Sequence, residues 1–381
     1  MASHIIARYR FHLRQRPAIL VGLTVVAIAF FLAVTGLSRA HQAQRQALGN
    51  RWFSRGVADL NAKRFEAAVT DFRAALLYSP DEYSYQLNLA EALIGQGHRA
   101  QAWAYLMNLR DREPDDGLVS LELARIAVQR GDTDDAVRYY HNAVYAAWPP
   151  QQEVKRRDAR LELIELLLRN GAKAQAQGEL IALAESLGPD PIQQERIGEL
   201  FLRAGDYQHA LGAFSDVLKA DPHNAAALAG AGYAALELRR LPIAQQYLRA
   251  AVAANANDAA SEERLRTTQL VMNLDPFRRQ IPVNERNKLV VQAFQTAGER
   301  LRSCKMPAVT AASAGAQPTL KDAWARLKPQ ITEQGLRRNP DLMETAMDLV
   351  FRIERDTSAV CGSPTGTDLA LLLIANMHEG T

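Results

Sequence analysis

The 381-residue sequence is long enough for two or three domains or one long array, and with 48% hydrophobic and 23% charged residues it should fold. The formal net charge of +3 arises at the N-terminus, because residues 1–40 contain five arginines and no acidic residue, which leaves 40 basic and 42 acidic side chains elsewhere. This near-neutral body argues against nucleic acid as the main partner, since phosphate binding needs a concentrated basic face.

An uncharged run follows a short basic head, residues 1–16. The run, residues 17–37, reads PAILVGLTVVAIAFFLAVTGL. As a helix that rises about 1.5 Å per residue, it spans about 31 Å, which is close to the hydrocarbon thickness of a bilayer. We therefore predict a transmembrane helix over 17–37 and a linker over 38–48. The alternative is a buried helix in the core of a soluble domain, but an uncharged run of this length is unusual for such a helix.

A cleaved signal peptide is the main competing interpretation of the same run. Ser38 and Ala40 are small residues three positions and one position before a possible cut. Cleaved signals have apolar segments of about 7–15 residues, so the greater length favours an uncleaved signal anchor. The basic head predicts a cytoplasmic N-terminus and a periplasmic body at a bacterial inner membrane. The charge bias behind this orientation is small, because three further arginines lie within 38–52.

A spacing of 34 residues recurs after the linker. RFEAAVTDFRAALLYSP at 64–80 and DYQHALGAFSDVLKADP at 206–222 share Ala, an aromatic residue, a small apolar residue and Pro at equal offsets. Their separation equals four periods plus six residues, and QQEVKR at 151–156 supplies the six. Self-similarity of this kind indicates a repeat architecture. The predicted units are 49–82, 83–116, 117–150, 157–190, 191–224 and 225–258.

Each unit has the pattern of two helices, so the predicted fold class is all-α. One position of the first helix is small in five units: Gly56, Ala90, Ala124, Gly198 and Gly232. One position of the second helix is alanine in all six: Ala68, Ala102, Ala136, Ala176, Ala210 and Ala244. Small side chains let the two helices approach closely, while an aromatic residue or leucine one turn later fills the next gap.

This pattern resembles the tetratricopeptide repeat family over residues 49–258. The resemblance implies an α-solenoid in the form of a right-handed superhelix, with a concave groove that binds protein or peptide partners and carries out no chemistry. The chain departs from the pattern in the fourth unit, where Ile164 replaces the small residue, and in the sixth, which lacks the closing proline.

By their offsets, side chains of the first helix of each unit should line the groove. This predicted set is Phe53, Val57, Asn61, Leu87, Glu91, Ile94, Leu121, Arg125, Leu161, Glu165, Glu195, Glu199 and Tyr233. It is largely aliphatic with scattered glutamates, which suits an amphipathic or extended partner segment. The alternative is that about half of these aliphatic residues pack against neighbouring helices instead. Some members of the family clamp a C-terminal carboxylate, but here only Asn88 matches, and Leu118 and Glu122 hold two of the other clamp positions.

The remaining sequence no longer follows the 34-residue period. Residues 259–276 are predicted to form a capping helix, since the last repeat must cover its apolar face. Residues 277–381 are predicted to form a C-terminal α-helical domain. Its expected helices are 284–303 with Asn284 as the cap, 319–336 with a kink at Pro329, 340–357, and a buried closing helix at 367–377.

Candidate chemistry is sparse in the sequence. Cys304 and Cys361 each follow a predicted helix and form a disulfide if the body is exported, or else remain two unpaired thiols. The eight histidines are scattered without metal-ligand spacing, and no phosphate-loop or nucleophile motif occurs. GAGYAA at 230–235 imitates a dinucleotide fingerprint without the required strand. We therefore predict no catalytic residue, no metal and no cofactor.

Together these features predict a membrane-anchored scaffold that binds protein or peptide partners, as an accessory to an envelope, secretion or polysaccharide-export assembly. One alternative is that the repeats serve an enzymatic or ligand-binding domain at 277–381. Another is a soluble, secreted scaffold that is released by cleavage at Ala40.

Overall fold

The structure, a computed structural model, describes residues 3–187, 190–304 and 319–378, with side chains described from residue 21 onward. Every regular element in these ranges is a helix, which confirms the predicted all-α fold. The chain divides into two compact units, residues 1–169 and 170–381. The division falls inside the fourth predicted repeat, between its two helices.

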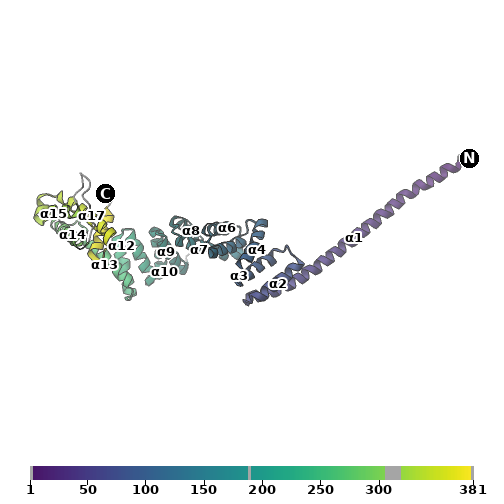
Figure 1. The fold of residues 1–381 in the computed structure, drawn as a ribbon, viewed down its shortest axis with the longest axis horizontal. Coiled ribbons are helices and arrows are strands. Elements are labelled where there is room, and N and C mark those ends of the chain that lie inside the picture. Colours follow the sequence, from purple (N-terminus) through teal and green to yellow (C-terminus); the bar gives the residue numbers. More distant parts are fainter. Residues whose placement is uncertain (1–2, 188–189, 305–318, 379–381) are drawn as a thin grey trace. The chain divides into compact units, whose positions relative to one another are not determined.

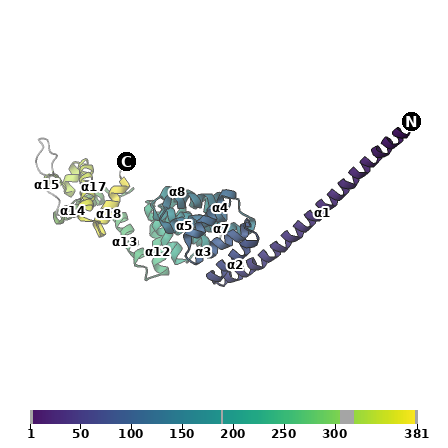
Figure 2. The same ribbon diagram turned by 45° about the vertical axis from the view of Figure 1, so that its right-hand side comes forward.

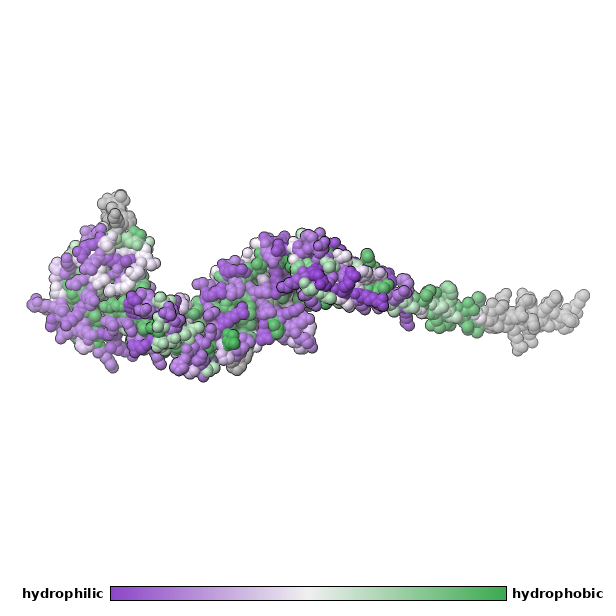
Figure 3. Space-filling model, turned by 90° about the horizontal axis from the view of Figure 1, so that it is seen from below, coloured by the Kyte–Doolittle hydropathy of each residue, from purple (hydrophilic) through white to green (hydrophobic). Residues whose placement is uncertain are grey.

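The first helix, α1 (Ser3–Asn61), runs without a break from the N-terminal segment into the first repeat (Figure 1). The segment expected to be a linker, 38–48, is therefore helical. Large apolar side chains between Val21 (61% exposed) and Leu37 (75%) lie in solvent, and Figure 3 shows this apolar surface along the helix. From Val21 onward, α1 is long and apolar enough to cross a membrane.

The rest of the first unit consists of consecutive helices that pack in pairs. These elements are α2 (Phe65–Tyr78), α3 (Tyr83–Gly95), α4 (Arg99–Arg112), α5 (Gly117–Arg130), α6 (Thr133–Tyr145), the 3₁₀ turn η1 (Pro150–Gln152) and α7 (Glu153–Arg169). The end of α1 packs on α2 (Figure 2), α3 packs on α4, and α5 packs on α6. The predicted insertion at 151–156 forms part of η1 and the first turn of α7, which is therefore longer than α2 to α6.

The second unit continues the helical pairs and then changes pattern. The repeat helices are α8 (Lys173–Ser186), α9 (Pro191–Ala204), α10 (Tyr207–Ala220), α11 (Ala225–Glu237), α12 (Leu241–Ala254) and α13 (Ala259–Leu274). The tail helices are α14 (Val283–Ser303), α15 (Leu320–Leu327), α16 (Glu333–Arg338), α17 (Leu342–Cys361) and α18 (Gly366–His378).

Small residues permit the close packing of the helical pairs. A Cβ atom added to the glycine of the first helix would lie well inside van der Waals contact of a buried side chain of the second. The pairs and distances are Gly56 to Phe72 (2.7 Å), Gly198 to Phe214 (2.8 Å) and Gly232 to Leu248 (2.7 Å). A larger residue at these positions would force the helices apart, which typically costs about 1–3 kcal/mol. The recurring small position thus has a direct steric cause.

The turns inside the pairs share one backbone geometry. In the third and fifth units a glycine, Gly131 (φ 80°) or Gly205 (φ 76°), adopts the left-handed conformation that ends the first helix. In the first unit Lys63 occupies the same place with φ 57°. Its N–H donates to the Leu60 carbonyl at 2.9 Å, and the next N–H, of Arg64, reaches Asp59 O at 2.8 Å. Lysine therefore holds a conformation that strains a residue with a Cβ atom.

The helix α13 has a neighbour on each side, because it contacts both α12 and α18. Its buried residues Val271 and Leu274 belong to the same apolar core as Phe294 of α14, Val350 of α17 and Leu371 of α18. The predicted capping helix thus joins the array to the tail through a shared core. The closing helix α18 is buried as expected, through Ala370, Leu371, Ile374 and Ala375.

Two expectations for the tail were wrong in detail. The helix α14 begins after Pro282, without a side-chain cap from Asn284. Residues 319–336 contain two short helices, α15 and α16, in place of one kinked helix. Pro329 has no N–H to continue the first helix, and Thr332 starts the second by accepting the N–H of Gly335 at 3.0 Å.

Cys304 and Cys361 form a disulfide in the structure, with their Cα atoms 5.9 Å apart. It joins the C-terminal end of α14 to that of α17, across 57 residues of sequence. Closing a loop of this length restricts the unfolded chain and stabilises the folded tail, typically by about 2–4 kcal/mol.

Replacing Lys63 with glycine should stabilise the protein by about 0.5–1 kcal/mol, because glycine adopts the left-handed conformation without a steric penalty. Thermal or urea unfolding measures the change. Ala62→Gly is the matched control, since Ala62 does not have a positive φ and the added chain entropy should destabilise. Equal losses for both variants would contradict the proposed strain.

The disulfide predicts that purified, unreduced protein takes up no thiol-alkylating reagent and gains two adducts after reduction under denaturing conditions. Replacing both Cys304 and Cys361 with serine should lower the stability of the tail by about 2–4 kcal/mol. Mass spectrometry and thermal unfolding are the two measurements. Two adducts on unreduced protein would show that the thiols are free.

Candidate functional site

The predicted groove residues differ widely in exposure. Three are exposed: Asn61, Glu91 and Glu199. Eight are half-buried: Phe53, Val57, Ile94, Arg125, Leu161, Glu165, Glu195 and Tyr233. Leu87 is 8% exposed and Leu121 is 1% exposed. Leu121 therefore belongs to the packed interior and, contrary to the prediction, offers no surface to a partner.

Some of the half-buried residues are already engaged within their unit. The ring of Phe53 stacks on that of Tyr85, with centroids 4.9 Å apart, and also contacts Phe72. The carboxylate of Glu195 accepts a hydrogen bond from Asn224 Nδ2 at 2.9 Å. These side chains hold neighbouring helices together, so the surface open to a partner is smaller than the predicted set.

A partly exposed surface in the first unit is formed by α3 and α5. Tyr83, Leu87 and Glu91 follow at intervals of four residues and so share one face of α3. Leu118 and Glu122 have the same relation on α5. Glu91 acts electrostatically on Glu122, and Leu118 lines the same cleft as Tyr83 and Leu87, so the two rows are neighbours. We call these five residues the α3–α5 face.

Arg125 connects this face to α7. Its guanidinium contacts Glu122 and Glu162 at 2.6 Å each, and the Tyr140 hydroxyl also donates to Glu162, at 2.8 Å. Burial raises the pKa of the Glu122 carboxyl, Arg125 opposes this rise, and the negative charges of Glu91 and Glu162 add to it. One arginine therefore pairs with two carboxylates, and the negative charge of Glu91 adds to the surroundings of Glu122.

A cleft of about 540 Å³ lies at one end of the α3–α5 face. We call it the acidic cleft. Its lining residues are Tyr83, Leu87, Glu113, Pro114, Asp115, Asp116, Gly117, Leu118, Ala147, Trp148, Pro149 and Gln152. They come from the starts of α3 and α5 and from the two loops that precede α5 and α7. All of them lie in the first unit.

Local contacts fix the shape of the acidic cleft. Asp116 caps α5 by accepting the N–H groups of Leu118 (2.8 Å) and Val119 (2.9 Å), and it also accepts the hydroxyl of Tyr83. Burial and this hydrogen bond to the carboxylate raise the pKa of Tyr83, which keeps the phenol protonated as the donor.

The indole of Trp148 forms the opposite wall. A Cβ atom added to Gly117 would lie 2.4 Å from this ring, so the absence of a side chain at Gly117 lets the indole pack against the start of α5. The indole N–H donates to the Ala143 carbonyl at 2.6 Å. The loop between α6 and α7 is held in this way against α5.

The charge of the acidic cleft is one-sided. Glu113, Asp115 and Asp116 line it, and the lining contains no lysine, arginine or histidine. Sequence analysis missed Glu113 and Asp115, although EPDDG at 113–117 and the tryptophan before Pro149 were visible signals. They were missed because the groove prediction used only the first helix of each unit and left out the loops.

A second cleft, of about 420 Å³, lies within the second unit, where α11 and α13 meet α18. Tyr233 is the predicted groove residue that lines it, and Arg264 stacks over its ring at 4.6 Å. Burial raises the pKa of Tyr233 to about 12. Unlike the acidic cleft, this one has both signs of charge, from Glu237 and Glu263 beside Arg239 and Arg264.

Profiles of known sequence families identify the family to which the chain belongs. Two family profiles, both described as tetratricopeptide repeat, match the chain: one at residues 53–98, 87–152 and 121–190, the other at 201–262. Together they cover just over half of the sequence. The chain belongs to the tetratricopeptide repeat family. A comparison with curated protein sequences gives no match.

Several solved structures resemble the chain at low identity. YrrB, described as a repeat protein with an unusual peptide-binding site, is 17% identical, with 50% of this chain and 95% of YrrB covered and a TM-score of 0.41. The pilF protein of Pseudomonas aeruginosa is 14% identical, with 58% and 97% covered and a TM-score of 0.40. PilW, described as a type IV pilus biogenesis factor, is 16% identical, with 58% and 98% covered and a TM-score of 0.37. At these scores the likenesses carry no argument about function.

The tail of this tetratricopeptide repeat protein buries a carboxylate. Glu354 of α17 is fully buried, and its Oε2 lies 3.4 Å from Arg300 Nε of α14. Asp368 of α18 lies 3.6 Å from the same guanidinium, which also donates to Thr357 Oγ1 at 2.9 Å. Burial and the negative charge of Asp368 raise the pKa of Glu354 to about 8, against the opposing effect of Arg300.

Among the residues that the structure describes, no cluster of three or more His, Cys, Asp or Glu side chains is arranged to hold a metal ion. The Arg300, Glu354 and Asp368 group is enclosed by α14, α17 and α18. Its buried carboxylate makes the stability of the tail depend on pH.

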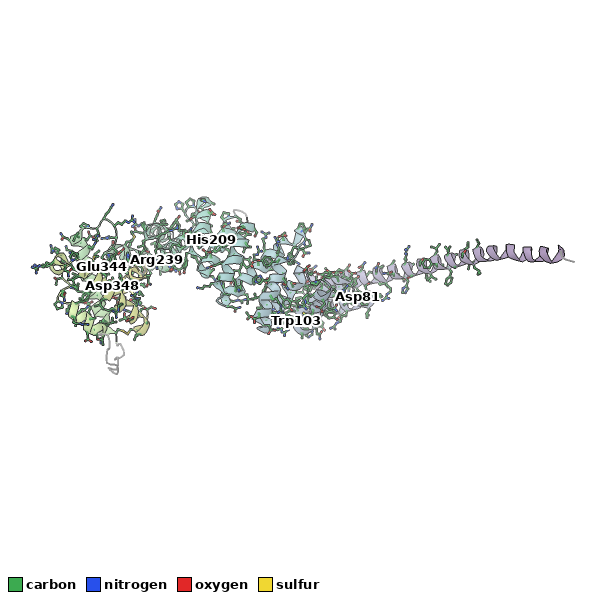
Figure 4. All side chains as sticks on the ribbon, turned by 90° about the horizontal axis from the view of Figure 1, so that it is seen from above. Asp81, Trp103, His209, Arg239, Glu344 and Asp348 are labelled. Atoms are coloured by element: carbon green, nitrogen blue, oxygen red, sulfur yellow. A yellow bond between two sulfur atoms is a disulfide. The ribbon has the colours of Figure 1, made fainter. Side chains whose placement is uncertain are left out.

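The folded-state pKa of Glu354, about 8, exceeds its ordinary value of 4.5. Its contribution to stability is therefore fully present below pH 4.5 and is lost as the pH rises through 8. Glu354→Gln, which cannot ionise, should lose less stability than the wild type between pH 6 and about pH 9. Thermal unfolding across this range measures the difference. Glu344→Gln, on the exposed side of the same helix (Figure 4), is the control and should follow the wild type.

Proposed function

We propose that this tetratricopeptide repeat protein is a single-pass membrane scaffold that binds a protein or peptide segment through the open faces of its first helices. The observation that carries the proposal is α1, which joins an exposed apolar segment directly to the first repeat. Repeats of this family bind partners, and the α3–α5 face offers an open surface in the first unit.

The continuous helix determines how the repeats would be held at the bilayer. The apolar run ends at Leu37, and tertiary packing begins near Gly49, with Arg45 Nη2 already bonded to the Leu77 carbonyl at 3.1 Å. Twelve helical residues span about 18 Å. A helix of this length keeps the first repeat close to the membrane surface, which raises the effective concentration of nearby membrane partners.

The proposal also includes the cellular compartment in which the body of the protein lies. The basic head, residues 1–16, favours an N-terminus in the cytoplasm and a body in the periplasm of a bacterium. The Cys304–Cys361 disulfide supports an oxidising compartment for the body. We infer that the protein is an accessory of an envelope, secretion or polysaccharide-export assembly.

A ligand-binding or enzymatic tail is the second candidate. The 420 Å³ cleft beside α18 favours it, because the cleft combines apolar side chains with charges of both signs. The shared core of α13, α14, α17 and α18 favours the first proposal, in which the tail caps the array. Release of a secreted scaffold at Ala40 would keep the partner site and lose the anchor.

A photo-cross-linking residue at position 91 in the full-length protein tests the scaffold. Glu91 is exposed on the α3–α5 face, and Ala104 on α4 is an exposed control outside it. The expected result is a discrete cross-linked species in the membrane fraction from position 91 and none from position 104. The same species in the soluble fraction would favour cleavage at Ala40, and equal labelling from both positions would contradict the proposed surface.

A further inference from the structure

The acidic cleft has charge that the protein itself leaves uncompensated. Glu113 and Asp115 are exposed, and neither forms an ion pair with any residue of the described ranges. Asp116 accepts only uncharged donors, namely two backbone N–H groups and the Tyr83 hydroxyl. Three carboxylates thus surround one concave space without a cation.

The walls of the acidic cleft suit a cation for a second reason. Tyr83 and Trp148 both line it, and each is fixed in place by a hydrogen bond, so the rings stay where a ligand would meet them. Lysine and arginine side chains are attracted to the faces of tyrosine and tryptophan. The carboxylates and the aromatic rings of this site therefore both favour a positively charged side chain.

The floor of the cleft is apolar and leads onto a longer surface. Leu87, Leu118 and Pro149 line it, and they can cover the methylene stem of a long basic side chain. Beyond the cleft, the α3–α5 face continues to Glu91 and Glu122, and Glu122 is paired with Arg125. A ligand that follows this face therefore meets apolar and acidic side chains together.

We propose that the acidic cleft binds a lysine or arginine side chain of a partner polypeptide, with an apolar residue of the same segment on Leu87 and Leu118. This inference rests on the proposed function and specifies the chemistry of the partner.

The test uses the full-length protein in lipid nanodiscs, with empty nanodiscs as the blank. The probe is fluorescein-labelled Ala-Leu-Ala-Lys-Ala-Leu-Ala-amide, and matched peptides carry Gln or Glu in place of Lys. Fluorescence anisotropy gives the affinity. The test variant combines Glu113→Gln and Asp115→Asn. The control combines Glu344→Gln and Asp348→Asn, an identical change of charge on the exposed side of α17 (Figure 4).

The lysine peptide should bind saturably, and the glutamine and glutamate peptides at least about tenfold more weakly, as loss of one close ion pair implies. The test variant should reduce the lysine-peptide affinity about tenfold, and the control should match the wild type. Raising the salt concentration from about 0.05 to about 0.5 M should weaken wild-type binding.

Three results would overturn the inference: no saturable binding of the lysine peptide below about 1 mM, equal binding of the glutamine peptide, or equal losses in the test and control variants. Cross-linking from position 91 separates this inference from the scaffold function. If that cross-link persists in the Glu113→Gln, Asp115→Asn variant while peptide binding fails, the scaffold stands and only the basic-segment chemistry is wrong.

Discussion

The contact between a glycine of one helix and a large side chain of the next sets the spacing of the first, fifth and sixth helical pairs. Where Gly56 faces Phe72, or Gly198 faces Phe214, a single added Cβ atom would occupy space that the ring already fills. Close approach buries the ring completely, which is worth about 2–3 kcal/mol. The same contact gives these three pairs a similar internal geometry.

Different elements lie at the two ends of the repeat array, where the apolar face of the terminal helix would otherwise be exposed. At the N-terminal end, α1 is both the first repeat helix and the exposed apolar segment, so no separate element lies between that segment and the array. At the other end, α13 is covered by α18 and shares a core with α14 and α17. The tail thereby protects an edge that a repeat array would otherwise expose to solvent.

Most of the correct fold prediction came from the periodicity of the sequence. The 34-residue spacing located the repeat helices, because packing permits only small residues at positions such as Gly56 and Gly198. The tail was less predictable, since α15 and α16 depend on how Thr332 restarts a helix after Pro329. The groove was predicted only in part. Offsets along a helix do not show whether a leucine such as Leu121 is covered by its neighbours.

The acidic cleft arises where the regular spacing is interrupted. The insertion at 151–156 follows Trp148 and Pro149, and it displaces the start of α7 by η1. Gly117 and Trp148 belong to the regular unit 117–150, and Gln152 is the lining residue that the insertion adds. Departures from a consistent local pattern tend to persist where function requires them. The insertion at the edge of the proposed partner site is one such departure.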